Sequence, residues 1–212
     1  MLGTHDLPLF IASGVLLNIT PGADVLFIVG RSTTQGVAAG VVAALGIGAG
    51  CLVHIVAASL GLSAVLAASA AAFTVVKLVG AGYLVYLGVG MLLRSRKATA
   101  REPEVATRIL SLRTVFAQGF LTNVLNPKVA LFFLAFLPQF IDAYAPHKAL
   151  GFLLLGCIFD FNGTIWNLFV AWSSARVASG FRSASRGAAW LSRGVGATFI
   201  YLGARLALSE NR

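Results

Sequence analysis

The chain has 212 residues, of which 58% are hydrophobic and only 11% are charged. A soluble domain carries about 25% charged residues, so this composition excludes an ordinary soluble protein and indicates that lipid surrounds much of the chain. The formal net charge of +9 does not indicate a nucleic-acid partner, because the basic residues lie between apolar runs and form no nucleic-acid-binding motif.

Six apolar segments follow one another along the chain, each long enough to cross a bilayer as a helix. A transmembrane helix needs about 20 predominantly apolar residues. The sequence therefore predicts an all-α integral membrane protein, with six transmembrane helices in a single domain that covers residues 1–212. The predicted helices are Leu7–Val29, Ala39–Leu66, Phe73–Leu93, Thr114–Ile141, Ala149–Trp172 and Trp190–Leu208.

Proline interrupts the first and the fourth predicted helix. Pro21 and Pro127 each remove a backbone donor and clash with the preceding turn. Thr20 and Asn126 stand directly before them and are good N-cap residues, and proline suits the first position of a helix. We therefore predict that both helices stop and restart inside the bilayer, where a restarted helix presents free N–H groups to an anionic or zwitterionic ligand. The alternative is a simple proline kink.

Two charged residues, Asp24 and Lys128, follow these breaks directly. A charge at the centre of a membrane helix costs about 2.5–3.5 kcal/mol, so such residues face a cavity or each other. In the first case Asp24 takes a substrate ammonium or a coupling proton and Lys128 takes a carboxylate, and in the second they form a structural ion pair. Asn18 and Asn123 lie in the same two segments and complete the predicted substrate-binding set, with the cap residues and prolines named above.

The two halves of the chain resemble each other. Gly14–Pro21 matches Gly119–Pro127 with one insertion, and Gly50–His54 matches Gly156–Asp160. A third match, in the same order, joins the third and sixth helices. These matches indicate two inverted three-helix repeats, an arrangement typical of secondary transporters, because an odd number of spans reverses the second unit. The first repeat covers about residues 7–93, a basic loop covers 94–113, and the second repeat covers about 114–208.

Lys and Arg residues are concentrated in three of the loops, those between the first and second, third and fourth, and fifth and sixth helices. Arg31 is the basic residue assigned to the first of these loops. Because Lys and Arg stay on the cytoplasmic side, we predict that these loops lie inside and that both termini lie outside.

Ionisable and thiol side chains occupy equivalent positions in the second and fifth helices. His54 corresponds to Asp160, and together with Asp24 these are the candidates for proton coupling, since histidine has an unperturbed pKa of about 6.5. A hydrogen-bonded packing role is the alternative for His54. Cys51 corresponds to Cys157, which raises a different function, a membrane thiol or electron relay, although both cysteines also suit the role of small packing residues. Asn162 and Asn167 share the helix of Asp160, so part of that helix is expected to line a cavity.

Several of these segments resemble the LysE/RhtB family of amino-acid exporters. Thr20–Asp24 is similar to the family's first-helix signature, with alanine at position 23 where the family often has a second proline. Asn126–Phe140 is the most specific match, and Gly46–Leu62, Lys77–Gly88 and Phe199–Leu208 also resemble family segments. The resemblance implies six spans and proton-driven export of amino acids or their derivatives, of the homoserine, threonine and lysine efflux type, across a bacterial inner membrane.

The sequence does not indicate an enzyme. It contains no nucleophile elbow and no His/Glu metal spacing, so we expect no catalytic residues, metal or cofactor. The expected partners are a small amino acid and the lipid bilayer, and the Gly- and Ala-rich helix faces would allow a homodimer.

Overall fold

A computed structural model describes residues 2–62, 109–142 and 145–177, together with Val75, Leu78, Gly82, Val85, Tyr86 and Val89. The predicted third helix therefore lies almost entirely outside the described residues, and the sixth lies wholly outside them. The same holds for most of the basic loop and for the second helix beyond Leu62.

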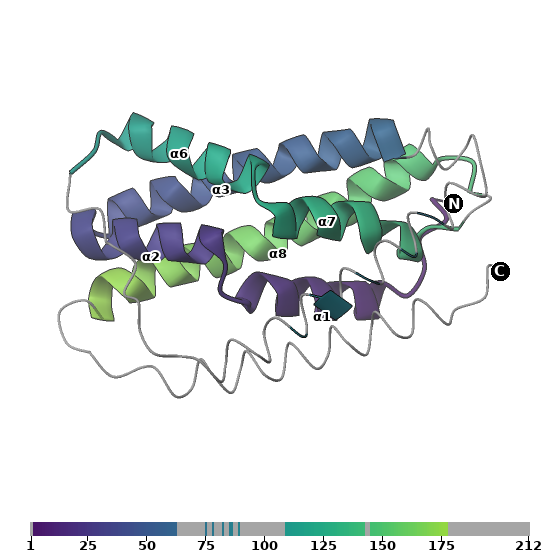
Figure 1. Cartoon of the computed structure of the whole chain (residues 1–212), viewed down its shortest axis with the longest axis horizontal. Coiled ribbons are helices and arrows are strands. Elements are labelled where there is room, and N and C mark those ends of the chain that lie inside the picture. Colours follow the sequence, from purple (N-terminus) through teal and green to yellow (C-terminus); the bar gives the residue numbers. More distant parts are fainter. Residues whose placement is uncertain are drawn as a thin grey trace.

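The described chain is built from helices that lie lengthwise beside one another (Figure 1). An isolated β-bridge between Thr4 and Ile141 ties the N-terminal segment to the chain after the second broken helix. The elements are α1 (Leu7–Ile19), α2 (Ala23–Gln35), α3 (Val37–Ala57), its π-helical extension η1 (Ala58–Leu62), α6 (Leu112–Val124), α7 (Pro127–Ala135), the 3-10 turn η2 (Leu137–Phe140) and α8 (Lys148–Val177).

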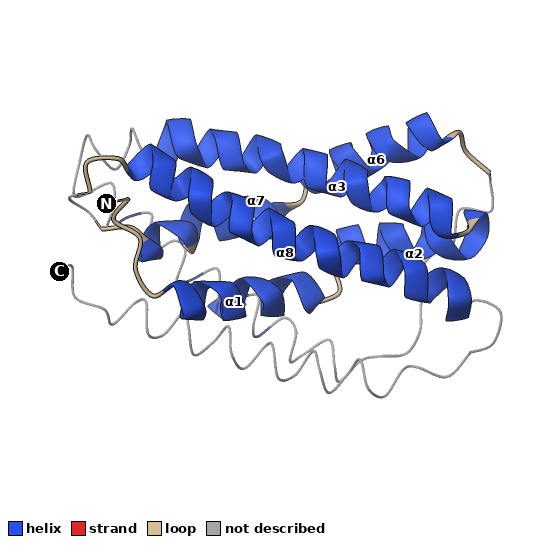
Figure 2. Cartoon of the chain, turned by 180° about the vertical axis from the view of Figure 1, so that it is seen from behind, coloured by secondary structure: helices blue, strands red, loops and turns tan. Residues whose placement is uncertain are grey.

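Two of these helical segments are long and apolar enough to cross a membrane on their own, namely Val37–Gly61 and Lys148–Arg176. The pair α1 and α2 meets the same criterion as a unit bent by 50°, and α6 with α7–η2 meets it with a bend of 45°. The described residues thus hold two spans, or up to four if each bent pair is one span. These correspond to the predicted second, fifth, first and fourth helices. Figure 2 shows α8 running the length of the bundle, where it packs against α1, α2 and α3.

The break predicted in the first helix is present, but its capping differs from the prediction. Thr20 ends α1 instead of starting α2, and its hydroxyl donates to Leu16 O at 2.7 Å. Gly22 is the N-cap of α2, without a side-chain cap, and the helix restarts at Ala23. Pro21 lies between the two helices and is not the first helical residue. The threonine hydroxyl satisfies a carbonyl of the preceding turn, so it is not available to cap the next helix.

The break in the second bent pair matches the prediction closely. Asn126 is the N-cap of α7, and its side-chain oxygen accepts from Lys128 N at 3.0 Å. Pro127 takes the first helical position, where its missing N–H leaves no intrahelical hydrogen bond unmade.

Arg31 does not lie in a loop, contrary to the prediction. Helix α2 continues through it to Gln35, and only Gly36 separates α2 from α3. The guanidinium is buried and donates to Gln35 Oε1 at 3.2 Å and to Gln118 Oε1 at 3.1 Å. These amide oxygens satisfy a cation that would otherwise be costly to bury, so the helix extends past it.

Candidate functional site

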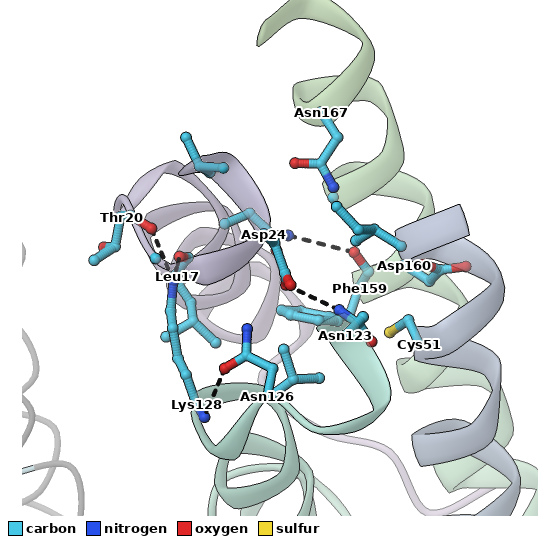
Figure 3. A pocket seen from close by; sticks show the side chains of 16 residues that line it. Leu17, Thr20, Asp24, Cys51, Asn123, Asn126, Lys128, Phe159, Asp160 and Asn167 are labelled. Carbon is cyan, nitrogen blue, oxygen red and sulfur yellow. Dashed lines mark hydrogen bonds between the residues drawn. The ribbon is translucent and has the colours of Figure 1, made fainter. Parts of the chain in front are cut away.

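A cavity lies in the middle of the bundle, where the break between α1 and α2 faces the break between α6 and α7 (Figure 3). Helices α3 and α8 form its remaining described wall. Of the residues predicted for the site, the cavity is lined by Asn18, Thr20, Asp24, Asn123, Asn126, Lys128 and Asp160, together with Cys51. Pro21, Pro127 and His54 are not part of this lining. The two prolines lie at the breaks but outside the cavity.

Asp24 and Asn123 join the two breaks directly. Asn123 Nδ2 donates to Asp24 Oδ2 at 2.9 Å, from the last turn of α6 to the first turn of α2. The second carboxylate oxygen of Asp24, Oδ1, and the amide oxygen of Asn123, Oδ1, are buried and have no hydrogen-bond partner among the described residues. Buried acceptors are normally satisfied, so two unsatisfied ones at the cavity wall are suited to a ligand that donates hydrogen bonds.

Lys128 also joins the two breaks, through the other two helices, α7 and α1. Its ammonium donates to Leu17 O at 2.7 Å and to Thr20 O at 2.8 Å, from the first turn of α7 to the end of α1. A cation suits the C-terminal end of a helix, where carbonyl groups lack intrahelical donors. Asp24 and Lys128 do not form the direct ion pair that the sequence allowed. Backbone carbonyls hold the ammonium instead, and the ion pairs within the described ranges are those of His5 with Asp6 and Asp142.

His54 does not line the cavity but contacts Asn123, which does. Its Nε2 is 3.1 Å from Asn123 O, and because a carbonyl can only accept, this nitrogen carries a hydrogen. The imidazole also stacks on Phe133, with ring centroids 5.9 Å apart. These contacts fit the packing alternative stated above, and they place His54 on the residue that holds Asp24.

Asp160 and Cys51 face each other across the α3–α8 wall, with the thiol within hydrogen-bonding reach of the carboxylate. Cys51 is buried, whereas Cys157 is exposed and does not line the cavity, and both are free thiols. This arrangement does not support the thiol relay. Among the described residues, no cluster of His, Cys, Asp and Glu could hold a metal ion.

Helix α8 contributes one face to the cavity. Asp160, Gly163 and Asn167 line it, at the spacing of one side of a helix. Gly163 leaves room for Asn18, because a β-carbon there would lie 3.1 Å from the amide of that side chain. Asn18 Nδ2 in turn donates to Phe159 O at 3.4 Å. Part of this helix therefore lines the cavity, as predicted, with Asn167 in the lining and Asn162 outside it.

Three features of the site were not predicted: the carbonyls of Leu17 and Thr20, the uncapped start of α2 at Gly22, and the Arg31–Gln118 contact. Backbone carbonyls carry no residue-type signature, so no sequence signal identifies the first. The Pro21–Gly22 pair could have indicated the second, because glycine at the start of a helix has no side chain to cap it. For the third, Gln118 is an amide in an apolar segment, and this could have indicated a polar partner on a neighbouring helix.

A family model described as LysE type translocator matches residues 15–210. The chain belongs to the LysE family. An uncharacterised membrane protein of Pseudomonas aeruginosa is 35% identical to it, over 97% of this chain and 96% of the relative. Another from Bacillus subtilis is 31% identical, over 79% and 82%. The leucine efflux protein of Salmonella typhimurium is 26% identical, over 95% and 94%. No solved structure matches the chain.

Membership of the LysE family confirms the resemblance stated from the sequence. With its apolar helices, this LysE-type translocator is a multi-pass membrane protein of a transporter family, not of an enzyme family. The family match begins at residue 15 and so includes both helix breaks and every residue that lines the cavity.

Proposed function

We propose that this LysE-type translocator exports small amino acids or close derivatives from the bacterial cytoplasm by proton antiport, through the cavity between the two helix breaks. The observation that carries the proposal is the pair of unsatisfied buried oxygens, Asp24 Oδ1 and Asn123 Oδ1, at the centre of two broken helices. A leucine efflux protein among the relatives supports an amino acid as the substrate.

An amino acid brings both charges that such a cavity can bind. Its ammonium has three donors, which suit the free oxygens of Asp24 and Asn123. Its carboxylate suits the start of α2, where Gly22 lines the cavity and provides no side-chain cap for the first N–H groups. Of the residues predicted from the sequence, Asp24 and Asn123 thereby hold the substrate ammonium, whereas Pro21 and Pro127 shape the breaks.

Transport follows from the arrangement of the two halves. We infer two inverted repeats in one domain, which rock against each other around Pro21 and Pro127 and expose the cavity to each side in turn. The similar bends of 50° and 45° support this, as do the reciprocal Asn123–Asp24 and Lys128–Leu17 contacts.

The orientation in the inner membrane is inferred from the basic residues. Helices α2 and α8 end, and α6 begins, at the same end of the bundle (Figure 1). Arg31, Arg113 and Arg176 lie in these terminal turns. The positive-inside rule then places this end in the cytoplasm and the N-terminal segment outside.

Export from whole cells tests the proposal. Bacteria that express the chain and are fed dipeptides should accumulate one or a few free amino acids in the medium, as measured by chromatography. Asp24→Asn removes the charge that holds the ammonium and should lower export at least about tenfold. Asp142→Asn is the matched control, since its side chain is 63% exposed and lies outside the cavity. Unchanged export in Asp24→Asn, with both variants in the membrane, would contradict the proposed site.

A further inference from the structure

Lys128 holds the first broken helix by an ammonium group, although the site as a whole is suited to bind an ammonium from outside. We propose that Lys128 carries the coupling proton, as a tethered ammonium that competes with the ammonium of the substrate for the acceptors between the two helix breaks. This inference rests on the proposed function and assigns its coupling step to one side chain.

The contacts of Lys128 are those expected of an ammonium ligand. Its backbone is fixed at the start of α7 by Asn126, and its side chain crosses to the end of α1, where two carbonyl oxygens accept from Nζ at 2.7 and 2.8 Å. The α-ammonium of an amino acid has the same charge and the same three donors. Acceptors that bind the one group can therefore bind the other.

Charge balance makes the two ammonium groups alternatives. Within the part of the chain that the structure describes, Asp24 is the charged residue that interacts with Lys128, while the Asp160 carboxylate lines the cavity from α8. One carboxylate balances one ammonium in a medium of low polarity, whereas two ammonium groups close together repel each other strongly. Loss of the Lys128 proton removes this repulsion and weakens the hold on the carbonyls of Leu17 and Thr20.

The other titratable groups near the site have different tasks. Among the described residues they are Asp24 on α2, Cys51 and His54 on α3, and Asp160 on α8, while the cavity residues of α1 and α6 are uncharged. Asp24 must stay charged to balance either ammonium. His54 needs its hydrogen for Asn123 O, and Asp160 is engaged by the thiol of Cys51. Among these groups, Lys128 is the one whose proton loss releases the end of α1 from the start of α7.

The cycle conserves charge and mass. With the cavity open to the cytoplasm, the Lys128 ammonium gives its proton to water. The zwitterion then binds with its own ammonium at Asp24 and Asn123 and at the carbonyls that Lys128 vacates. With the cavity open to the outside, the substrate leaves and the neutral amine takes a proton from that side. The protonated, empty carrier then returns. Each turnover moves one zwitterion out, one proton in and one positive charge in.

Two transport modes in vesicles separate this role from substrate binding. The purified full chain is reconstituted in phosphatidylethanolamine–phosphatidylglycerol vesicles, with radiolabelled leucine as the probe. Exchange of leucine at equal pH needs only the loaded carrier, whereas accumulation driven by an acidic interior needs the protonated one. Lys128→Gln should keep exchange within about threefold of the wild type and lose accumulation at least about tenfold. Lys148→Gln, the same change at the start of α8 outside the cavity, should lose neither.

The pH dependence gives a second readout. One proton that excludes one substrate should weaken the apparent affinity of the wild type for leucine by up to about tenfold per unit as pH falls. Lys128→Gln should show no such dependence. Lys128→Arg, a permanent cation, should exclude leucine at every pH. Lys128→Met replaces Lys128→Gln if the latter does not elute as a folded protein.

The results that would overturn the role of Lys128 differ from those that would overturn the proposed function. Accumulation by Lys128→Gln at the wild-type level would overturn the inference, as would normal exchange by Lys128→Arg. Loss of exchange and accumulation together in folded Lys128→Gln would make Lys128 a substrate ligand instead. A wild type that exchanges none of the common amino acids would overturn the proposed function, whatever the variants do.

Discussion

The two ends of the bundle are packed by different means. Around α1, α7 and η2, the core consists of aromatic rings, which contact one another over the side chains of Phe10, Phe132, Phe136, Phe140 and Phe159. Around α2, α3 and α6, the described core consists of aliphatic residues and alanines without a buried aromatic ring, and glycines let the backbones approach closely. A β-carbon on Gly50 would lie 2.6 Å from Phe120 O, and one on Gly119 would lie 2.7 Å from Ala43 O. The cavity lies between these two regions.

This difference indicates which contact moves during transport. Backbones that touch through glycine leave no room for a shift, and they hold α3 and α6 at a fixed distance. Ring contacts between side chains can change by rotation about side-chain bonds while the helices keep their hydrogen bonds. We therefore expect the two repeats to rock about the α3–α6 contact, which stays closed, while the aromatic region rearranges when the cavity changes sides.

The largest effect on stability is expected in the aromatic region. Phe132 is buried, and its ring lies 4.5 Å from that of Phe159 and 5.0 Å from that of Phe136, measured between centroids. Phe132→Ala should cost about 3–5 kcal/mol, because the cavity it leaves has no partner atoms. Thermal unfolding in detergent measures this, with Phe132→Leu as the milder comparison. A loss no greater than that of Phe132→Leu would show that the rings do not hold this region together.

A smaller loss of stability is expected in the glycine-packed region, where α3 and α6 touch through Gly50 and Gly119. Gly50→Ala adds one methyl group against Phe120 O and the β-carbon of Asn123, so α3 and α6 must move apart. Overpacking of this kind costs about 1–3 kcal/mol. The same thermal assay measures it. Tolerance of the methyl group without loss of stability would mean that this contact is not rigid, and the comparison above would fail.

Replacement of Arg31 tests the polar contacts between α2 and α6 at the end of the glycine-packed region. Arg31→Ala removes the donors to Gln35 Oε1 and Gln118 Oε1. Amide oxygens left without a donor in a buried site cost about 1–3 kcal/mol, and access of water to this end lowers the expected loss toward the smaller value. Arg31→Lys is the control that keeps the charge but not the forked geometry. Equal stability of wild type and Arg31→Ala would argue against a structural role for these contacts.

The smallest effect is expected at Gly30. It lies within α2, and a β-carbon there would have nothing within 4 Å. Gly30→Ala should therefore leave packing unchanged and stabilise the helix by up to about 1 kcal/mol. This variant is also the matched control for Gly50→Ala. Destabilisation by Gly30→Ala would show that loss of a glycine is harmful even where no close contact exists.

The sequence was sufficient to locate both helix breaks, because proline removes a backbone donor wherever it stands. It was also sufficient to predict that Asp24, Asn123 and Lys128 lie at one cavity, since charges and amides in apolar helices need an interior face. It was not sufficient to name their partners. Lys128 binds backbone carbonyls instead of Asp24, and Arg31 is buried within a helix instead of lying in a loop. In both cases a distant chain segment supplies an acceptor that the sequence does not reveal.

Direct binding of amino acid to the purified protein tests the central claim most sharply. Radiolabelled leucine, or the amino acid that the export assay identifies, is titrated against the wild type, Asp24→Asn and Asn123→Ala, with Asp142→Asn as the control. We expect one saturable site in the wild type and in the control, with affinity weakened at least about tenfold in both cavity variants. Equal affinity in all four proteins would place the substrate away from the helix breaks.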